Sequence, residues 1–484
     1  ADGKASSLGT GRGRTAGEAG TIWLERNNVT NTLTFNPSSE WIGWTMTENE
    51  PALAQIDIDI GASVKYSNNT FLKAATLAVQ GSLISCAGSI DNGGALNQQL
   101  FISVSTLNLG AQAIVQGQIE MNTSTLPVLD IPTGALLDGL TNLTGMVPYQ
   151  QMFVAGSVSF QHKTGSPVHV GVMKELVIKN GGTLRLKMID QTATALAGVE
   201  LRAPTIIVDA GGVLEIVGAA SLYVNVLNVS GTLKATGGKS RIGQGPCPVW
   251  STCPNFRYAG ATHGGIGGTT THDAEGYRWL NTYGSITYPV EVGSTTDGST
   301  SVGGGAIRVV ASSMVEIGPE GIVSADGGGT RYYGKGSGGS VLLIAPKVTS
   351  YGRISADGGH LKPNTDTGEG NGGGGRIAFH SDEVMFGATA VVSVADGKAS
   401  SLGTGRGRTA GDAGTVFLSI KRQFAGGNLH GSYLGGTEFP VFWSTGLGGY
   451  PQCRFGDTIV NATKTNSSQP INSMCLPGNS SFTP

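Results

Sequence analysis

Hydrophobic residues alternate with polar ones in short runs along this 484-residue chain, and glycine separates each run from the next. The form recurs at residues 76–84, 175–186, 205–216, 227–235, 315–328 and 348–359. Alternation with a period of two predicts half-buried β-strands, and a glycine between two runs permits a sharp bend. Because Gly or Pro interrupts nearly every window with a helical pattern, we expect almost no helix.

The spacing of the glycines predicts how these strands are arranged. Gly182 and Gly212 are 30 residues apart, and Gly321 and Gly352 are 31 apart. A second set, in which glycine leads into a strand, is spaced by 34, 36 and 39 residues at Gly305, Gly339, Gly375 and Gly414. Periods of about 20–50 residues are typical of solenoids and propellers. The two-residue hairpins of propeller blades are not the rule here, so we expect a parallel β-helix with coils about 4.8 Å apart.

This pattern divides the chain into five expected segments. A partial coil occupies residues 1–25, and β-helix coils occupy 26–238. Residues 239–302 form a glycine-rich insertion that is too long for an ordinary loop, so we expect an ordered insertion or packed glycine arches. Coils resume at 303–425, and 426–484 form a small β-sandwich-like segment. The expected fold class is therefore all-β.

One segment of the chain is nearly duplicated. Residues 1–21 recur at 395–415 with a single change, Glu18 against Asp412, and the strand residues that follow are similar. An open strand edge at the first copy would pair with another chain, and a head-to-tail contact that does not close builds filaments. The duplication leaves two interpretations open, head-to-tail self-association and excision of this chain from a longer tandem solenoid.

Composition narrows the class of protein and its partners. Glycine accounts for 78 residues but lacks the three-residue period of collagen, and many small apolar residues argue against disorder. The net charge is −2 without a long basic run, so we do not expect a nucleic-acid partner. No stretch of about eighteen apolar residues occurs, so we expect no membrane span.

The cysteines and the glycosylation sequons point to an oxidising, extracellular route. Cys247 and Cys253 flank a short loop, and Cys453 and Cys475 enclose 21 residues, so each pair could form a disulfide. Zinc-ligand spacing is absent, and Cys86 is left as a buried thiol or an intermolecular bridge. Covalent glycans are expected on the sequons at Asn28, Asn68, Asn122, Asn142, Asn228, Asn461, Asn466 and Asn479.

Candidate catalytic and metal-binding residues are few. Asp326, Asp357 and Asp396 recur at what the sequence predicts to be the same point of successive coils. They could stack as a Ca²⁺-binding ladder, or each could serve its own Asp-Gly turn. His263 is followed by two glycines but no carboxylate set accompanies it, and a metal site with His272 and Asp273 competes with simple loop polarity. We therefore expect no enzymatic activity and no cofactor.

Residues 230–420 resemble a known group of proteins in the order and spacing of their repeats. The stretches that carry the resemblance are Gly303-Gly-Gly-Ala-Ile-Arg-Val, Ile322-Val-Ser-Ala-Asp-Gly-Gly, Ile354-Ser-Ala-Asp-Gly-Gly and Gly372-Gly-Gly-Gly-Arg-Ile-Ala-Phe. This region resembles large secreted glycine-rich β-helix proteins of protists and some bacteria, including mastigoneme-like surface proteins of stramenopile algae. The resemblance implies a right-handed, pectin-lyase-like β-helix at the cell surface.

The tail resembles a different module. Gln452-Cys-Arg-Phe-Gly and Met474-Cys-Leu-Pro are similar to the latter part of an immunoglobulin-like IPT/TIG domain. That resemblance implies that strands carrying Cys453 and Cys475 are bridged. Taken together, the sequence predicts a glycan-bearing structural subunit of an extracellular fibre, filament or surface coat. The alternative is a carbohydrate-binding or polysaccharide-degrading β-helix.

Overall fold

A computed structural model provides the structure of the protein. It describes residues 22–27, 30–35, 40–44, 52–66, 70–85, 99–121, 128–141, 148–162, 169–188, 198–237, 260–268, 282–295, 302–329, 334–359, 370–397, 411–423, 441–444, 452–455 and 458–461. Within these residues every regular element is a β-strand. The chain divides into an N-terminal unit (1–189 with 211–214) and a C-terminal unit (190–210 with 215–484).

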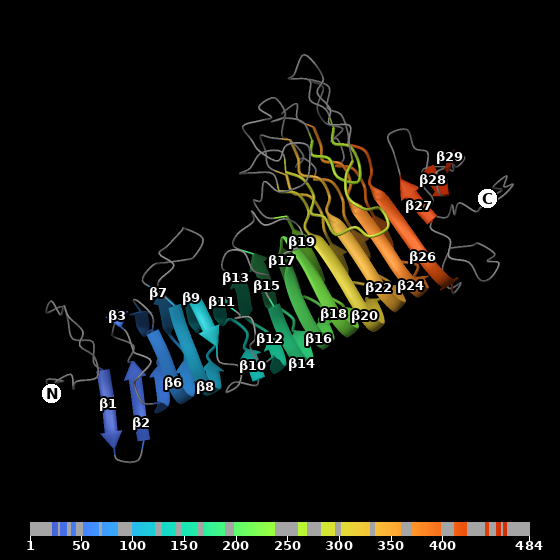
Figure 1. Ribbon diagram of the computed structural model, residues 1–484. Helices are drawn as coiled ribbons and strands as arrows, with labels where there is room; N and C mark the ends of the chain where they lie inside the picture. The colour runs from blue at the N-terminus through green and yellow to red at the C-terminus, as the bar shows by residue number, and fades with distance from the viewer. Residues whose placement is uncertain are drawn as a thin grey trace. The chain divides into compact units, whose positions relative to one another are not determined.

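The N-terminal unit consists of strands that lie side by side in parallel (Figure 1). The first series of paired strands is β2 (Thr30–Phe35), β4 (Leu53–Ile58), β6 (Thr70–Val79) and β8 (Gln99–Leu109). A second series is β10 (Val128–Ile131), β12 (Tyr149–Val154) and β14 (His169–Ile178). A third is β3 (Glu40–Trp44), β5 (Ser63–Tyr66), β7 (Ser82–Ser85), β9 (Ile114–Met121), β11 (Leu136–Thr141), β13 (Ser157–His162) and β15 (Thr183–Met188).

The burial pattern of the longer strands explains how each coil encloses a core. In β6, Leu72 and Ala74 are buried on one alternation, and Leu77 and Val79 are buried on an alternation shifted by one residue. A strand that changes phase in this way bends, so both of its halves direct apolar side chains toward the same interior. Short strands such as β5 and β7 then close the coil, with Val64 and Leu83 buried.

The C-terminal unit repeats this plan with longer strands. Its principal series is β16 (Val199–Val208), β18 (Ala219–Val229), β20 (Ala306–Ile317), β22 (Ser340–Ser350), β24 (Arg376–Phe386) and β26 (Thr415–Gln423), all parallel. The short series is β19 (Thr232–Thr236), β21 (Ile322–Ser324), β23 (Arg353–Ser355) and β25 (Val391–Ser393). β17 (Val213–Val217) contains residues of both units.

The predicted fold class is confirmed: the described chain is an all-β, right-handed parallel β-helix. The predicted recurrence of glycine at the entry to successive strands, at Gly305, Gly339, Gly375 and Gly414, is confirmed as well, and we call these residues the glycine column. Main-chain hydrogen bonds run from Ser340 N to Gly305 O (3.0 Å), from Arg376 N to Gly339 O (2.9 Å) and from Thr415 N to Gly375 O (3.0 Å). Each glycine of the column therefore lies directly beside its counterpart in the next coil.

Two parts of the described chain depart from the parallel plan. β1 (Ile22–Asn27), at the end of the first duplicated segment, pairs antiparallel with β2. β27 (Val441–Ser444) pairs antiparallel with β26, and β28 (Gln452–Phe455) pairs antiparallel with β29 (Thr458–Asn461). Most of the expected β-sandwich-like segment at 426–484 lies outside the described residues, so its fold stays a prediction.

Candidate functional site

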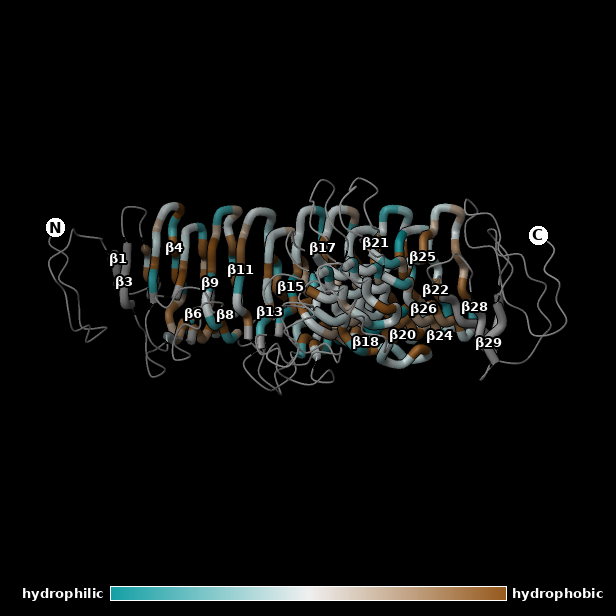
Figure 2. The backbone as a smooth tube through the Cα atoms, turned by 90° about the horizontal axis from the view of Figure 1, so that it is seen from above, coloured by the Kyte–Doolittle hydropathy of each residue, from teal (hydrophilic) through white to brown (hydrophobic). Residues whose placement is uncertain are grey.

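Glycine-rich segments of the C-terminal unit pack together as a bundle beside the coils, which we call the glycine bundle. Figure 2 shows it as a compact group of nearly white tubes, a colour that marks near-neutral hydropathy. The bundle comprises residues 260–268, 302–305, 325–328, 334–339, 356–359, 370–375, 394–397 and 411–414. It includes described parts of the predicted insertion and the segments that lead into the later strands.

Main-chain hydrogen bonds hold the glycine bundle together. Within the central segment, Gly373 N donates to Ala261 O (2.9 Å) and Gly374 N donates to Asp412 O (2.9 Å). Gly373 O and Gly374 O accept from Gly338 N and Gly265 N in turn. One segment therefore bonds to neighbours in several directions, whereas a strand bonds only within a sheet.

At many glycines of the bundle, the closeness of the neighbouring backbones leaves no room for a side chain. A Cβ added to Gly374 would lie 2.0 Å from Val394 O, and one added to Gly338 would lie 2.0 Å from Ala356 O. Real Cβ atoms do not approach a carbonyl oxygen so closely, because the atoms would overlap. The high glycine content thus has a physical cause, which is close packing of main chains.

A buried polar cluster joins the insertion to the coils. His263 is fully buried, and its Nδ1 donates to Gly338 O at 2.8 Å. Its ring lies 4.5 Å from the ring of Tyr283, whose hydroxyl donates to Val292 O at 2.8 Å. The Arg376 guanidinium donates from Nε to Tyr283 O and from Nη1 to Thr415 Oγ1, both at 2.9 Å. We call His263, Tyr283 and Arg376 the polar anchor.

Burial dominates the electrostatics of the polar anchor. It lowers the pKa of His263 to about 3, and the positive charge of Arg376 acts in the same direction. Burial also lowers the pKa of Arg376 to about 10, against the opposing effect of the Glu291 carboxylate. His263 is therefore neutral at pH 7, and with Nδ1 acting as the donor its Nε2 carries a lone pair that has no partner in the described chain.

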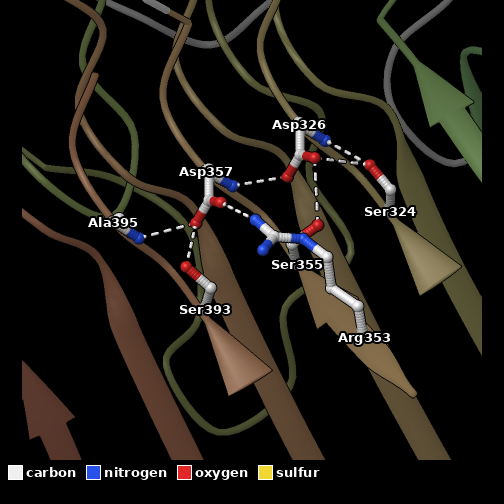
Figure 3. Close-up of polar contacts among 7 residues, drawn as sticks. All are labelled: Ser324, Asp326, Arg353, Ser355, Asp357, Ser393 and Ala395. Carbon is white, nitrogen blue, oxygen red and sulfur yellow. Dashed lines mark hydrogen bonds and ion pairs between the residues drawn. The ribbon is translucent and has the colours of Figure 1, made fainter. Parts of the chain in front are cut away.

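Two aspartates form a ladder between successive coils (Figure 3). Asp326 accepts hydrogen bonds from Asp357 N (2.7 Å) and from the hydroxyls of Ser324 (2.7 Å) and Ser355 (2.9 Å). Asp357 in turn accepts from Ala395 N (2.7 Å) and from Ser393 Oγ (2.5 Å). Each carboxylate therefore holds the backbone of the next coil.

Opposing effects act on the pKa of Asp357, the second aspartate of this ladder. Burial raises the pKa of Asp357, and the nearby Asp326 carboxylate adds to the increase. Hydrogen bonds from Ser393 and Ala395 and the positive charge of Arg353, which forms an ion pair with Asp357, oppose it. Among the described residues no group of three or more potential ligands is arranged to hold a metal ion.

The prediction that Asp396 occupies the same point as Asp326 and Asp357 is wrong. β23 and β25 pair Ser355 with Ser393, so the residue beside Asp357 is Ala395. The segment after β25 reads Val-Ala-Asp-Gly where the preceding coil has Ala-Asp-Gly. This additional residue moves Asp396 one position along the chain, and the ladder ends at Ala395.

The outer face of the C-terminal unit carries a row of rings and guanidinium groups. Arg202 lies 4.4 Å from the ring of Tyr223, and Arg308 lies between Tyr223 (5.8 Å) and Tyr288 (5.4 Å). The ring of His380 is 6.0 Å from that of Tyr288, which is 39% exposed. The insertion thus continues from the polar anchor onto the outside of the sheet.

The sequence-predicted modification sites are largely outside the described residues. This applies to Cys86, Cys247, Cys253 and Cys475; Cys453 lies in β28, where its backbone pairs with Val460. Asn28, Asn68, Asn122, Asn142, Asn466 and Asn479 are outside too, as are His272 and Asp273, and Asn461 ends β29. Asn228 is half-buried in β18, between the buried Leu227 and Val229, so its side chain faces away from the core.

Tyr283 and Arg376 were not singled out in the sequence, although one signal for Arg376 is present. The strand-entry positions that pair with one another are Ala306, Ser340, Arg376 and Thr415, so a charged residue stands where small residues otherwise occur.

Comparisons with protein-family models, curated proteins and solved structures found no match. In the described residues, no helix has the length and hydropathy needed to cross a membrane.

Proposed function

We propose that this protein is a structural subunit of an extracellular fibre, filament or surface coat, which assembles by end-to-end stacking of its solenoid. The observation that carries the proposal is the glycine bundle, in which main-chain groups bond from segment to segment and many glycines lie too close to neighbouring backbone to be replaced. A backbone-packed wall beside stacked coils suits a mechanical role, because its hydrogen bonds are numerous and its shape is fixed.

The sequence supports the extracellular part of this proposal. Eight sequons and two pairs of cysteines at loop-closing spacing fit a secreted glycoprotein with disulfides at Cys247–Cys253 and Cys453–Cys475. The resemblance to pectin-lyase-like and mastigoneme-like surface proteins, and that of the tail to IPT/TIG domains, points to the same location. We further propose that the partners of the chain are other copies of itself.

Electron microscopy with mass spectrometry tests this function. The chain is secreted from eukaryotic cells, and its intact mass is measured before and after enzymatic removal of N-glycans and after reduction. We expect a glycosylated, disulfide-bonded protein whose negatively stained particles lengthen as its concentration rises. Particles of constant length at every concentration would refute assembly, and an unglycosylated product would refute the glycan component.

A second candidate function, carbohydrate binding, is favoured by the row of rings on the outer face. Tyr223 and Tyr288 flank Arg308, and partly exposed aromatic rings next to a cation can stack on sugars. Affinity electrophoresis of the protein in gels containing acidic or neutral polysaccharides tests this function. Retardation that the Tyr288→Ala variant loses would support it, and equal migration of both proteins in every gel would exclude it.

A further inference from the structure

The described part of the near-duplicate segment, residues 395–397 and 411–418, occupies a specific site in the C-terminal unit. β26 lies parallel to β24, and its residues Val416, Phe417 and Leu418 pair with Ile377, Ala378 and Phe379. Phe417 is 4% exposed and packs in a cluster with Leu342 and Ala378. We call residues 370–381, which receive the segment, the rung seat.

Main-chain contacts hold residues 412–415 of the segment against the rung seat and against Ile266. Gly374 N donates to Asp412 O at 2.9 Å, and Asp412 N donates to Ile266 O at 2.6 Å. A Cβ added to Gly414 would lie 1.8 Å from Gly375 O, so this position accepts only glycine. The side chain of Thr415 contributes the acceptor for Arg376 Nη1.

Every residue used in these contacts has a matching residue in the first copy. Gly414 corresponds to Gly20 and Thr415 to Thr21, and Phe417 corresponds to another aromatic residue, Trp23. The one change over residues 1–21, Glu18 for Asp412, falls where the rung seat contacts the main chain of the segment. The chemistry that seats one copy is therefore present in both.

The strand that ends the first copy also has the same antiparallel arrangement as its counterpart. β1 pairs antiparallel with β2, with Ile22 opposite Phe35, and β26 pairs antiparallel with β27, with Val416 opposite Trp443. In addition, β26 has β24 as a parallel partner on the side of the coils. A rung seat in another molecule would give β1 the corresponding parallel partner.

We propose that residues 1–24 of a second copy dock in the rung seat in place of residues 395–418, so that molecules join by exchange of these near-duplicate segments, which we call rungs. This proposal rests on the self-association proposed above and names its contact. The molecule's own rung is tethered to the seat, and a tether of this kind gives it an effective concentration in the millimolar range. Exchange in the wild-type protein is therefore weak at low concentration and increases when the tethered rung is disabled.

Two matched valine variants test the exchange by sedimentation velocity across a range of protein concentrations. Gly414→Val disables the tethered rung and leaves the first copy intact, so we expect association at a concentration at least about tenfold below that of the wild type. Gly20→Val disables the donor, so association should be lost. Glu18→Asp, which makes the two copies identical over 1–21, should behave as the wild type.

The double variant Gly20→Val/Gly414→Val separates rung exchange from non-specific adhesion of a vacated edge. It should be monomeric; association equal to that of Gly414→Val would overturn the proposal. If the wild type and Gly20→Val form equal fibres, rung exchange is wrong and the proposed fibre function stands. If none of the proteins associates at any concentration, both proposals fail.

Discussion

The Asp326 carboxylate accepts a hydrogen bond from the main-chain N–H of Asp357 at 2.7 Å, so an acidic side chain of one coil caps the backbone of the next. The same carboxylate also accepts the hydroxyl hydrogens of Ser324 and Ser355. Removing it leaves three donors without this acceptor in a half-buried setting. Coils of the C-terminal unit are therefore joined by side-chain bonds as well as by the main-chain ladder.

We expect Asp326→Ala to lower the free energy of unfolding by about 1–3 kcal/mol, the cost of leaving buried donors unsatisfied. Asp326→Asn, which keeps one oxygen acceptor, should lose less. Glu320→Ala provides the control, because Glu320 is exposed on a turn of the same coil. Urea unfolding measures all three variants, and an Asp326→Ala midpoint equal to that of the control would disprove the capping role.

Because main chains pack closely in the glycine bundle, the loss of stability on replacing a glycine by alanine should depend strongly on its position. Gly374→Ala places a Cβ 2.0 Å from Val394 O and 2.4 Å from Gly414 N, so backbone must shift at an expected cost of about 1–3 kcal/mol. At Gly328 the nearest atom to an added Cβ is Val302 Cγ2 at 3.2 Å, a side-chain atom that can move. Gly328→Ala should therefore cost under about 1 kcal/mol. Thermal unfolding compares the two variants; equal losses would argue against backbone contact as the cause.

The sequence predicted the fold where one physical constraint repeats, and it failed where contacts depend on register. The column of Gly305, Gly339, Gly375 and Gly414 was predictable because each coil needs the same close approach at the same point. Asp396 was misplaced because one additional residue after β25 shifts the register, and an Ala-Asp-Gly match does not detect that shift. Arg376 was missed because its partners Tyr283 and Thr415 are distant in sequence.

Arg376 is expected to hold the insertion on the coils. Its guanidinium joins Tyr283 O to Thr415 Oγ1, and a lysine ammonium carries the charge but not the fork that reaches both. In Arg376→Lys and Arg376→Gln, amide hydrogen exchange at residues 282–295 should accelerate by at least about tenfold, because a buried contact worth about 1.4 kcal/mol or more is lost. Arg202→Gln, at a side chain that is 62% exposed, is the control. Unchanged exchange at 282–295 in both Arg376 variants would exclude the anchoring role.

The buried His263 predicts a specific acid sensitivity. Its pKa is lowered from 6.5 to about 3 in the folded protein, so between these values the unfolded chain binds a proton that the folded chain excludes. Stability from this group is therefore complete above pH 6.5 and falls as the pH decreases, by up to about 1.4 kcal/mol per pH unit.

A variant that cannot titrate isolates this effect. His263→Gln keeps a donor for Gly338 O but cannot titrate. The difference in unfolding free energy between wild type and variant should thus change in the variant's favour by up to about 2.7 kcal/mol between pH 6.5 and pH 4.5. Asp357, whose raised pKa acts with the opposite sign, is present in both proteins and cancels in the comparison. Urea midpoints at the two pH values give the measurement, and a difference that stays constant would show that His263 is protonated equally in the folded and unfolded chains.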